Sequence, residues 1–169
     1  MQHDPAYWKA HLGLEPHPEG GFYREIYRSA EVLDMDSLPE RYPGDRNLAT
    51  CIYFLLEQDS FSAFHRLESD ELWHYHAGDP LTIYLLDPRT KSLTAEHLGP
   101  RPDLGHALTS VIPHDTWFAA RVDAGGVFSL VSCTVVPGYN DEDFFLAERD
   151  LLQTVFPEHA DLIASLTRG

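Results

Sequence analysis

Residues 62–86 read SAFHRLESDELWHYHAGDPLTIYLL, and this stretch decides the fold class. Its ionisable and aromatic residues alternate with apolar ones along two strand-like segments: His65, Asp70, Glu71, Trp73, His74 and Tyr75. A Gly-Asp-Pro turn at 78–80 leads into a further strand-like run. Polar and aromatic groups alternating along strands are what a small β-barrel needs to line an internal pocket. The stretch therefore predicts an all-β fold with a polar pocket.

Short strand candidates follow one another through the central part of the chain. Gly, Pro and Asp separate eight of them: 49–56, 60–66, 70–77, 81–87, 92–98, 106–112, 116–122 and 127–136. Eight short strands at this spacing are typical of a sandwich or barrel and not of a parallel α/β sheet. We expect residues 1–169 to form a single domain, because a chain of this length supports one full-sized core.

Helical patterns flank the strand region. The segment 4–14 predicts a short helix that Asp4 caps and Gly13 ends. After the last strand candidate, 141–156 predicts a second helix and 158–167 a third, with Pro157 between them. Residues 30–46 contain two prolines, a glycine and many charges, so we expect a loop there.

The composition restricts the partners. A net charge of −15, from 27 acidic and 12 basic residues, argues against nucleic acid and against anionic membranes as partners. The N-terminus has no signal-peptide pattern and no apolar run is long enough to span a bilayer, so we expect a cytoplasmic location. Cys51 and Cys133 lie in apolar runs, which favours buried free thiols and leaves a single disulfide open.

Five segments, taken in order, resemble one known superfamily: HPEGGFYREIYRS (17–29), IYFLL (52–56), SAFHRLESDELWHYHAGDPL (62–81), VIPHDTWFAARV (111–122) and SLVSCTVVPGYNDEDF (129–144). They resemble the cupins, and more narrowly the small single-domain type-five cupins. The resemblance implies an RmlC-like jelly-roll β-barrel with short flanking N- and C-terminal helices, and a homodimer. It implies no particular activity, because one cupin scaffold supports many chemistries.

Metal-binding cupins hold a divalent ion with three His and one Glu from two motifs, HxH followed by Glu and Gly, and PxGxxH. With Gly78 as the closing Gly, Glu71 is the motif glutamate and His65 takes the second His position, while Ala63 takes the first. In the second motif Phe118 stands where the third His is expected. Two of the four ligands are therefore missing. We expect no cofactor; a divalent metal would rely on His65 and Glu71 with waters or substrate atoms.

His74 and His76 form an HxH that does not fit this register. Strand alternation puts them on the face opposite Glu71 and Trp73. If Glu71 points into the barrel, both histidines point away from it. We expect this pair on the outer face or at an interface.

Seven residues are candidates for the pocket. His65 can act as general base or acid because imidazole titrates near neutral pH, and Tyr75 is the candidate for returning the proton. Glu71 needs a partner, because buried carboxylates are rarely left unpaired. Arg24, which strand alternation places on one face with Arg28, could hold an anion. The remaining ligand-binding candidates form an aromatic wall together with Tyr75, although core packing is the alternative for each ring: Trp73, Trp117 and Phe118.

Three functions stay open from the sequence. The first is binding of a small anionic or sugar-like metabolite in the barrel without chemistry. The second is a metal-independent epimerase or isomerase of a sugar nucleotide, in which His65 removes a proton, Tyr75 returns one and Arg24 holds the anionic part. The third is a divalent-metal cupin with the reduced set His65 and Glu71. Whether the protein is an enzyme is left open.

Overall fold

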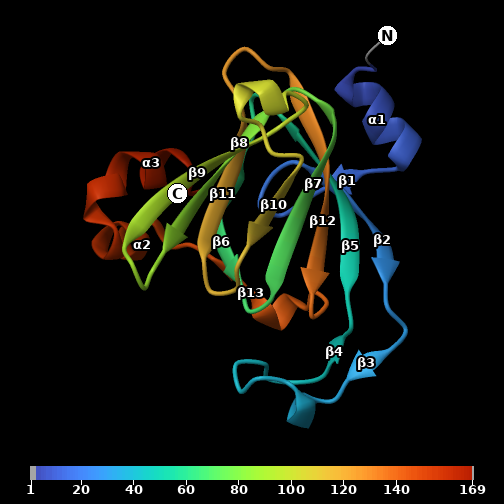
Figure 1. The fold of residues 1–169 in the computed structure, drawn as a ribbon, viewed down its shortest axis with the longest axis vertical. Coiled ribbons are helices and arrows are strands. Elements are labelled where there is room, and N and C mark those ends of the chain that lie inside the picture. The colour runs from blue at the N-terminus through green and yellow to red at the C-terminus, as the bar shows by residue number, and fades with distance from the viewer. Residues whose placement is uncertain (1–2, 169) are drawn as a thin grey trace.

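The computed structural model describes residues 3–168 and consists mainly of two antiparallel sheets packed face to face (Figure 1). The larger sheet has the order β1-β2-β5-β12-β7-β10, with these bounds: β1 (Glu15–Pro16), β2 (Phe22–Arg28), β5 (Thr50–Glu57), β7 (Asp70–Gly78), β10 (Thr109–Ile112) and β12 (Phe128–Val136). The smaller has the order β13-β6-β11-β8-β9, with these bounds: β6 (Ser62–Leu67), β8 (Leu81–Asp87), β9 (Ser92–Leu98), β11 (Trp117–Val122) and β13 (Phe144–Leu146). The predicted all-β jelly roll is confirmed.

All eight predicted strands form, because their apolar residues alternate toward the space between the sheets. The largest difference is at β10, which starts at Thr109 instead of 106. In β2 the predicted alternation is wrong. A register shift between Glu25 and Tyr27 leaves Ile26 without a partner on β5, so Arg28 joins Tyr23 and Glu25 on the inner face. Such a bulge reverses the parity of every later residue in the strand.

The helices are shorter than the sequence suggests. The helix α1 (Pro5–Leu12) forms as predicted, with the Asp4 carboxylate accepting from Tyr7 N at 2.7 Å and Gly13 ending it at φ +62°. The helix predicted over 141–156 is wrong in its first half, which forms the 3-10 turn η3 (Asp141–Asp143) and β13. Pairing of β13 with β6 outweighs local helical preference there. The C-terminal helices are α2 (Arg149–Val155) and α3 (Ala160–Ser165), joined by η4 (Pro157–His159).

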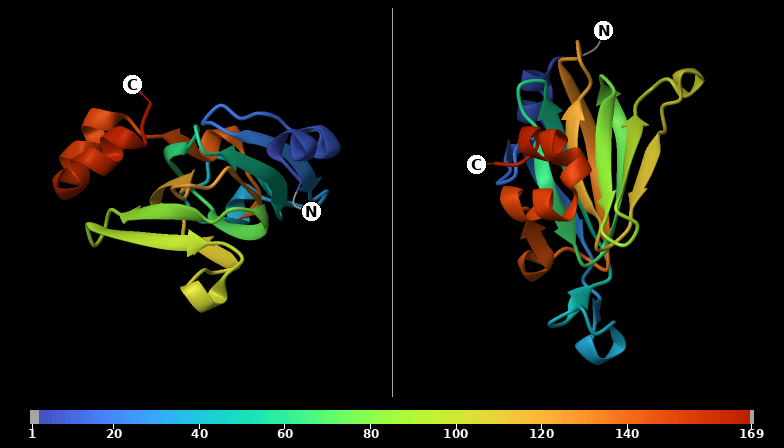
Figure 2. Two further views of the ribbon diagram at one scale, coloured as in Figure 1. Left: turned by 90° about the horizontal axis from the view of Figure 1, so that it is seen from above. Right: turned by 90° about the vertical axis from the view of Figure 1, so that its left-hand side faces the viewer.

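Residues 30–47, which we call the arm, extend away from the barrel (Figures 1 and 2). The predicted loop contains a small ribbon, β3 (Val32–Leu33) and β4 (Arg46–Asn47), with the 3-10 turn η1 (Met35–Ser37). At its base Arg46 donates to both carboxylate oxygens of Asp143 at 2.6 Å, and both side chains are buried. This ion pair fastens the arm to the segment after β12.

The space between the sheets divides into two ends. At one end a tightly packed apolar core includes Leu81, Ile83 and Leu98. A second apolar cluster lies between the smaller sheet and α2 and α3, which flank the barrel in Figure 2. Neither cysteine forms a disulfide. Within the described range, no helix combines the length and apolarity needed to cross a bilayer.

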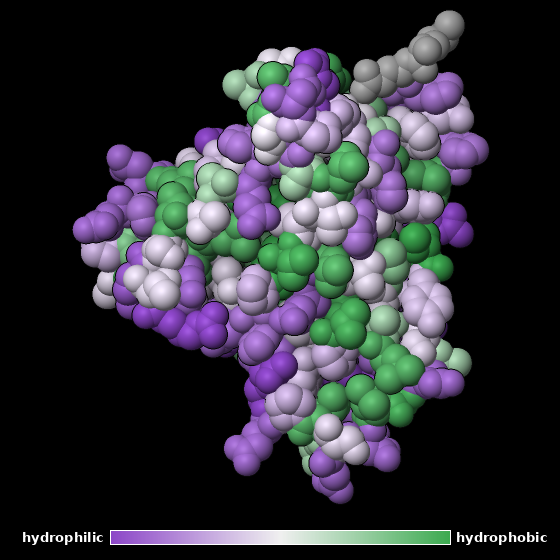
Figure 3. Space-filling view, in the orientation of Figure 1, coloured by the Kyte–Doolittle hydropathy of each residue, from purple (hydrophilic) through white to green (hydrophobic). Residues whose placement is uncertain are grey.

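The outer surface carries apolar side chains near the lower ends of the strands and over the arm, in the orientation of Figure 3. Large apolar residues that are exposed in these elements are Ile26 and Tyr27 on β2, Val32 on β3, Met35 in η1 and Val136 at the end of β12.

Candidate functional site

The opposite end of the barrel is a cavity of about 290 Å³. Along β5 the inward residues change from Thr50 and Ile52 at the cavity to Phe54 and Leu56 in the packed core. On β7 the change comes nearer the mouth: Glu71, level with Thr50, lines the cavity, whereas Trp73, level with Ile52, already belongs to the packed core. The polar part of the wall is concentrated in these residues: Glu15, His17, Glu19, Tyr23, Glu25, Arg28, Thr50, His65, Glu71, Cys133, Tyr139 and Asp141.

His65, on β6, is fixed in one tautomer. Its Nδ1 lies 2.7 Å from the carbonyl oxygen of Ala63. Because a carbonyl can only accept, Nδ1 carries the ring proton and Nε2 keeps a lone pair. Burial lowers the pKa of His65 to about 3, although the Ala63 bond works in the opposite direction. The ring is therefore neutral at pH 7, with Nε2 available as an acceptor or base.

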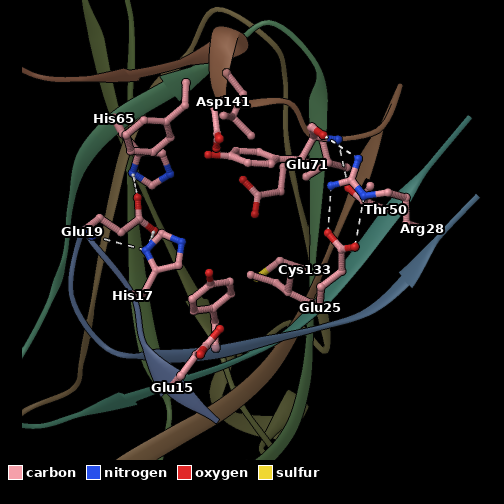
Figure 4. Close-up of a pocket in the computed structure, with 16 residues that line it drawn as sticks. Glu15, His17, Glu19, Glu25, Arg28, Thr50, His65, Glu71, Cys133 and Asp141 are labelled. Atoms are coloured by element: carbon pink, nitrogen blue, oxygen red, sulfur yellow. Dashed lines mark hydrogen bonds and ion pairs between the residues drawn. The ribbon is translucent and has the colours of Figure 1, made fainter. Parts of the chain in front are cut away.

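His17, in the turn between β1 and β2, has the opposite tautomer. The backbone N–H of Glu19 donates to its Nδ1 at 3.3 Å, so the ring proton is on Nε2. Burial lowers the pKa of His17 to about 4, so this ring too is neutral at pH 7. Figure 4 shows the second nitrogen of each ring facing the interior. The cavity thus presents one imidazole donor and one imidazole acceptor.

Glu19 lies between the two rings and is 6% exposed. Its Oε1 accepts from Ser62 Oγ at 3.1 Å. Its Oε2 lies 3.1 Å from His65 Nδ1, but that nitrogen donates to Ala63, and Oε2 has no hydrogen-bond partner among residues 3–168. Burial first, and then the charge of Glu71, raise the pKa of Glu19 well above its usual value.

Two glycines bring Glu19 into the barrel. Gly20 and Gly21 have φ of +115° and +77°, a backbone conformation that glycine adopts without strain. A Cβ on Gly20 would collide with the Phe61 carbonyl, and one on Gly21 would lie 2.7 Å from the Leu55 carbonyl. The HPEGG sequence thus turns tightly against β5 and β6. The side chains of His17 and Glu19 are directed inward as a result.

Glu71, on β7, projects its carboxyl toward the centre of the cavity (Figure 4) and is 7% exposed. Its Oε2 also has no hydrogen-bond partner in the part of the chain that the structure describes. Burial raises the pKa of Glu71 to about 7, and the adjacent Trp73 and Cys133 side chains offset only part of that effect. Two buried carboxyl groups therefore face one cavity with unused oxygens.

Arg28, at the mouth, is fully engaged. Its Nε and Nη2 donate to the Glu25 carboxylate at 3.0 and 2.8 Å, while Nη1 donates to Asn47 Oδ1 at 2.8 Å and to the Tyr139 carbonyl at 3.1 Å. This guanidinium is the cation of the described wall, and it already has an anionic partner. Across residues 3–168, no three His, Cys, Asp or Glu side chains converge where they could hold a metal ion.

The structure brings together two of the seven predicted residues, His65 and Glu71. The expected cavity-facing position is wrong for the other five. Trp73 and Phe118 are buried in the apolar core, with the Phe118 ring 4.0 Å from that of His65. Tyr75 donates to the Gly78 carbonyl at 2.6 Å, at the packed end of the barrel.

Arg24 and Trp117 lie outside the barrel interior. Arg24 is exposed and donates to the Leu12 carbonyl at 3.0 Å, because only the residues after the β2 bulge change face. Trp117 packs in a surface hollow with Phe145 and Leu151. His74 and His76 point away from the cavity as predicted and bond Thr109 and Ser132.

Sequence reasoning missed Glu19 and His17. Both lie in the HPEGG segment, where a Glu beside two glycines and two residues from a His is a usable signal. Simple alternation puts Arg28 on the face of Arg24, whereas the bulge separates the two and only Arg28 reaches the cavity. Tyr139 and Asp141 reach the mouth through the fold of the segment after β12, for which no local pattern exists.

Comparison with known proteins agrees with this architecture. The sequence model described as Cupin_5, Cupin superfamily (DUF985), matches residues 6–147. A protein of known crystal structure from Shewanella oneidensis is 36% identical over 99% of both chains, with a TM-score of 0.88. A hypothetical protein from Leishmania major is 34% identical over 99% of this chain and 100% of its own, with a TM-score of 0.89. No curated protein sequence matches the chain.

More distant structures share the fold alone. Oxalate decarboxylase from Bacillus subtilis is 11% identical, with a TM-score of 0.54 over 89% of this chain and 36% of its own. The family match, covering most of the sequence, and the two full-length relatives above 30% identity agree with the jelly roll and with the resemblance in its motifs. The chain belongs to the Cupin_5 (DUF985) family of the cupin superfamily.

Proposed function

We propose that the protein binds a small, hydroxyl-bearing metabolite of about monosaccharide size in the cavity. The proposal rests on the buried Oε2 atoms of Glu19 and Glu71, which have no hydrogen-bond partner among residues 3–168 and lie beside the two neutral imidazoles. Buried polar groups are normally hydrogen-bonded, and a ligand that donates to the carboxyls and accepts from His17 would supply the partners. The volume lies at the low end of the roughly 300–1,000 Å³ typical of ligand pockets. A whole sugar nucleotide would extend beyond it.

The wall does not favour the anionic ligand that the sequence left open. Arg24 lies outside the cavity, and Arg28 is paired with Glu25. Five carboxyl groups line the cavity, and the exposed carboxyls of Glu15 and Asp141 would repel an anion.

The test is a ligand screen by thermal shift and calorimetry with a blocked variant and a matched control. Val135→Phe fills the cavity from β12, whereas Val111→Phe makes the same change on the exposed outer face of β10. Sugars or polyols should stabilise the wild type and Val111→Phe but not Val135→Phe. Equal stabilisation of all three proteins would place binding elsewhere and contradict the proposal.

Proton transfer within the same site is a second candidate, favoured by the opposite tautomers of the two histidines. His65 Nε2 can take a proton from a carbon beside a ligand carbonyl, while His17 Nε2–H donates to the carbonyl oxygen as negative charge develops there. Delivery of a proton to the opposite face of that carbon completes an epimerisation; delivery to the former carbonyl carbon, with loss of the proton from the neighbouring hydroxyl, completes an aldose–ketose isomerisation. Tyr75 is unsuited to this return because its hydroxyl bonds Gly78. Incubation in D₂O should put deuterium into a bound keto-sugar, and His65→Gln should abolish the exchange; exchange that survives in His65→Gln would contradict this candidate.

We also propose that the protein acts as a cytoplasmic homodimer. The exposed apolar residues on β2 and the arm would supply the buried surface, since large exposed patches commonly mark interfaces. Light scattering coupled to size exclusion measures the mass in solution. A monomer at all concentrations would contradict the dimer.

A further inference from the structure

We propose that the cavity selects an organic cation, a small metabolite with an ammonium group, which the carboxyls of Glu19 and Glu71 bind directly. The inference rests on the proposed binding function and names the chemical class of its ligand. It follows from the charges that face the cavity, from the carboxyl oxygens that lack partners, and from the rings around them.

The charge balance of the described wall is negative. Carboxyl groups come from five residues: Glu15, Glu19, Glu25, Glu71 and Asp141. Arg28 forms its ion pair with Glu25, at 2.8 Å, and Asp141 also interacts with its charge. Burial keeps His17 and His65 uncharged at neutral pH. Arg168 approaches Glu19 from outside the cavity, where it donates to the backbone carbonyl at 2.7 Å.

The buried carboxyls of Glu19 and Glu71 can each accept a further hydrogen bond. Glu19 and Glu71 are each more than nine-tenths buried, and each keeps one oxygen free of partners within residues 3–168. A carboxyl buried without a cation is unfavourable in its charged form. An ammonium group between the two would donate to both and restore their charge. A neutral hydroxyl can satisfy the hydrogen bonds, but it does not favour the charged form of the carboxyls and so gains no ion-pair attraction.

The surroundings suit an ammonium group better than a metal ion. No group of three His, Cys, Asp or Glu side chains converges in residues 3–168. A protein site for a divalent ion usually needs at least three such ligands. An ammonium needs two or three acceptors and also gains from aromatic faces. Tyr23, Tyr139 and Phe144 supply rings on the wall. Asp141 and Glu15 add negative charge at the entrance, which attracts cations.

The experiment uses two matched ligand pairs, glucosamine with glucose and butane-1,4-diamine with butane-1,4-diol. Calorimetry on the wild type should give at least tenfold tighter binding for an amine than for its hydroxyl counterpart. Glu71→Gln keeps the shape and removes the charge, so it should reduce this preference at least fivefold. Glu40→Gln makes the same change at an exposed residue of the arm and should leave the preference intact.

Proton release gives a second readout. Glu71 faces Glu19 and His17 from the β1–β2 turn, His65 from β6, Cys133 from β12 and Arg28 from β2. Because Glu71 holds a proton near neutral pH, binding of an ammonium should expel it. Calorimetry at pH 7 in phosphate and in MOPS, a zwitterionic buffer without a net cationic form and with a different ionisation enthalpy, should reveal the release in the wild type and less of it in Glu71→Gln.

The two proposals fail in different ways. Glucose or the diol binding as tightly as its amine, or Glu71→Gln retaining the full preference, overturns the cation inference and leaves metabolite binding standing. A stoichiometric metal in protein purified without chelator, displaced by the amines, also overturns it. Absence of binding by all four probes, together with no stabilisation by any ligand of the screen, overturns both.

Discussion

Two buried carboxyls of this barrel have opposite surroundings. Asp143, beside the arm, is 2% exposed, and Arg46 donates to both of its oxygens at 2.6 Å. Glu71, in the cavity, is 7% exposed and faces a second buried carboxyl, with no cation at hydrogen-bond distance in the described chain. A paired buried charge holds two segments together. An unpaired one costs stability, and such an arrangement is typical of sites where a ligand completes the structure.

The largest expected change in the free energy of unfolding comes from breaking the ion pair between Arg46 and Asp143. Arg46→Met leaves Asp143 buried without a cation, which should lower the free energy of unfolding by about 3–5 kcal/mol. Urea denaturation measures the loss. The double variant Arg46→Met/Asp143→Leu should recover much of it, because the stranded charge is gone. A loss below about 1 kcal/mol in the single variant would mean that water screens the ion pair between Arg46 and Asp143.

Removing the unpaired carboxyl of Glu71 is expected to raise the free energy of unfolding instead of lowering it. Glu71 has a pKa of about 7 in the folded protein against 4.5 ordinarily, so between these values the folded state holds a proton that the unfolded state has lost. The contribution of Glu71 to the stability of the wild type therefore falls as the pH rises through this window. Glu71→Gln should be more stable than the wild type by about 3 kcal/mol at pH 8 and nearly equal to it at pH 4.

Urea denaturation at intervals from pH 4 to pH 8 measures this difference. The buried histidines titrate in both proteins and cancel in the comparison. Glu40→Gln, on the exposed arm, serves as the control and should show no pH-dependent gain. A Glu71→Gln variant that loses stability at pH 8 would show that this carboxylate already has a cationic partner.

The smallest effect is expected at the mouth. Arg28 and Glu25 are about 40% exposed, with 38% and 42% of their side chains accessible, so their ion pair is screened by water. Arg28→Met should change the free energy of unfolding by less than about 1 kcal/mol. It should also tighten amine binding, because Glu25 is then unopposed. Weaker amine binding in this variant would indicate that Arg28 contacts the ligand.

Much of the fold was predictable because its signals are local. The motif register predicted Glu71 in the pocket, strand alternation put His74 and His76 on the opposite face, and the cap residues Asp4 and Gly13 predicted α1. The helix predicted over 141–156 is wrong at Phe144. This residue pairs with Leu67 of β6, which is distant in the sequence, and forms a strand instead.

The site was less predictable because its parts come from distant segments. His65 and Glu71 belong to the stretch that decides the fold, but Glu19 enters from a glycine turn more than forty residues earlier. Strand alternation alone puts Arg28 on the same face as Arg24. The bulge in β2, which the sequence does not reveal, moves Arg28 to the opposite face. The aromatic candidates were assigned to the wall, whereas the position of Trp73 further along β7 puts it in the packed core.

The contact between Arg168 and the Glu19 carbonyl joins residues 149 positions apart. A ribosome adds roughly 5–20 residues per second and keeps the newest part of the chain inside its exit tunnel. The turn that carries His17 and Glu19 therefore emerges early, whereas Arg168 emerges only after every strand of the described barrel. Until Arg168 emerges, the turn lacks this contact. The candidate site thus receives one of its supports later than the strands that surround it.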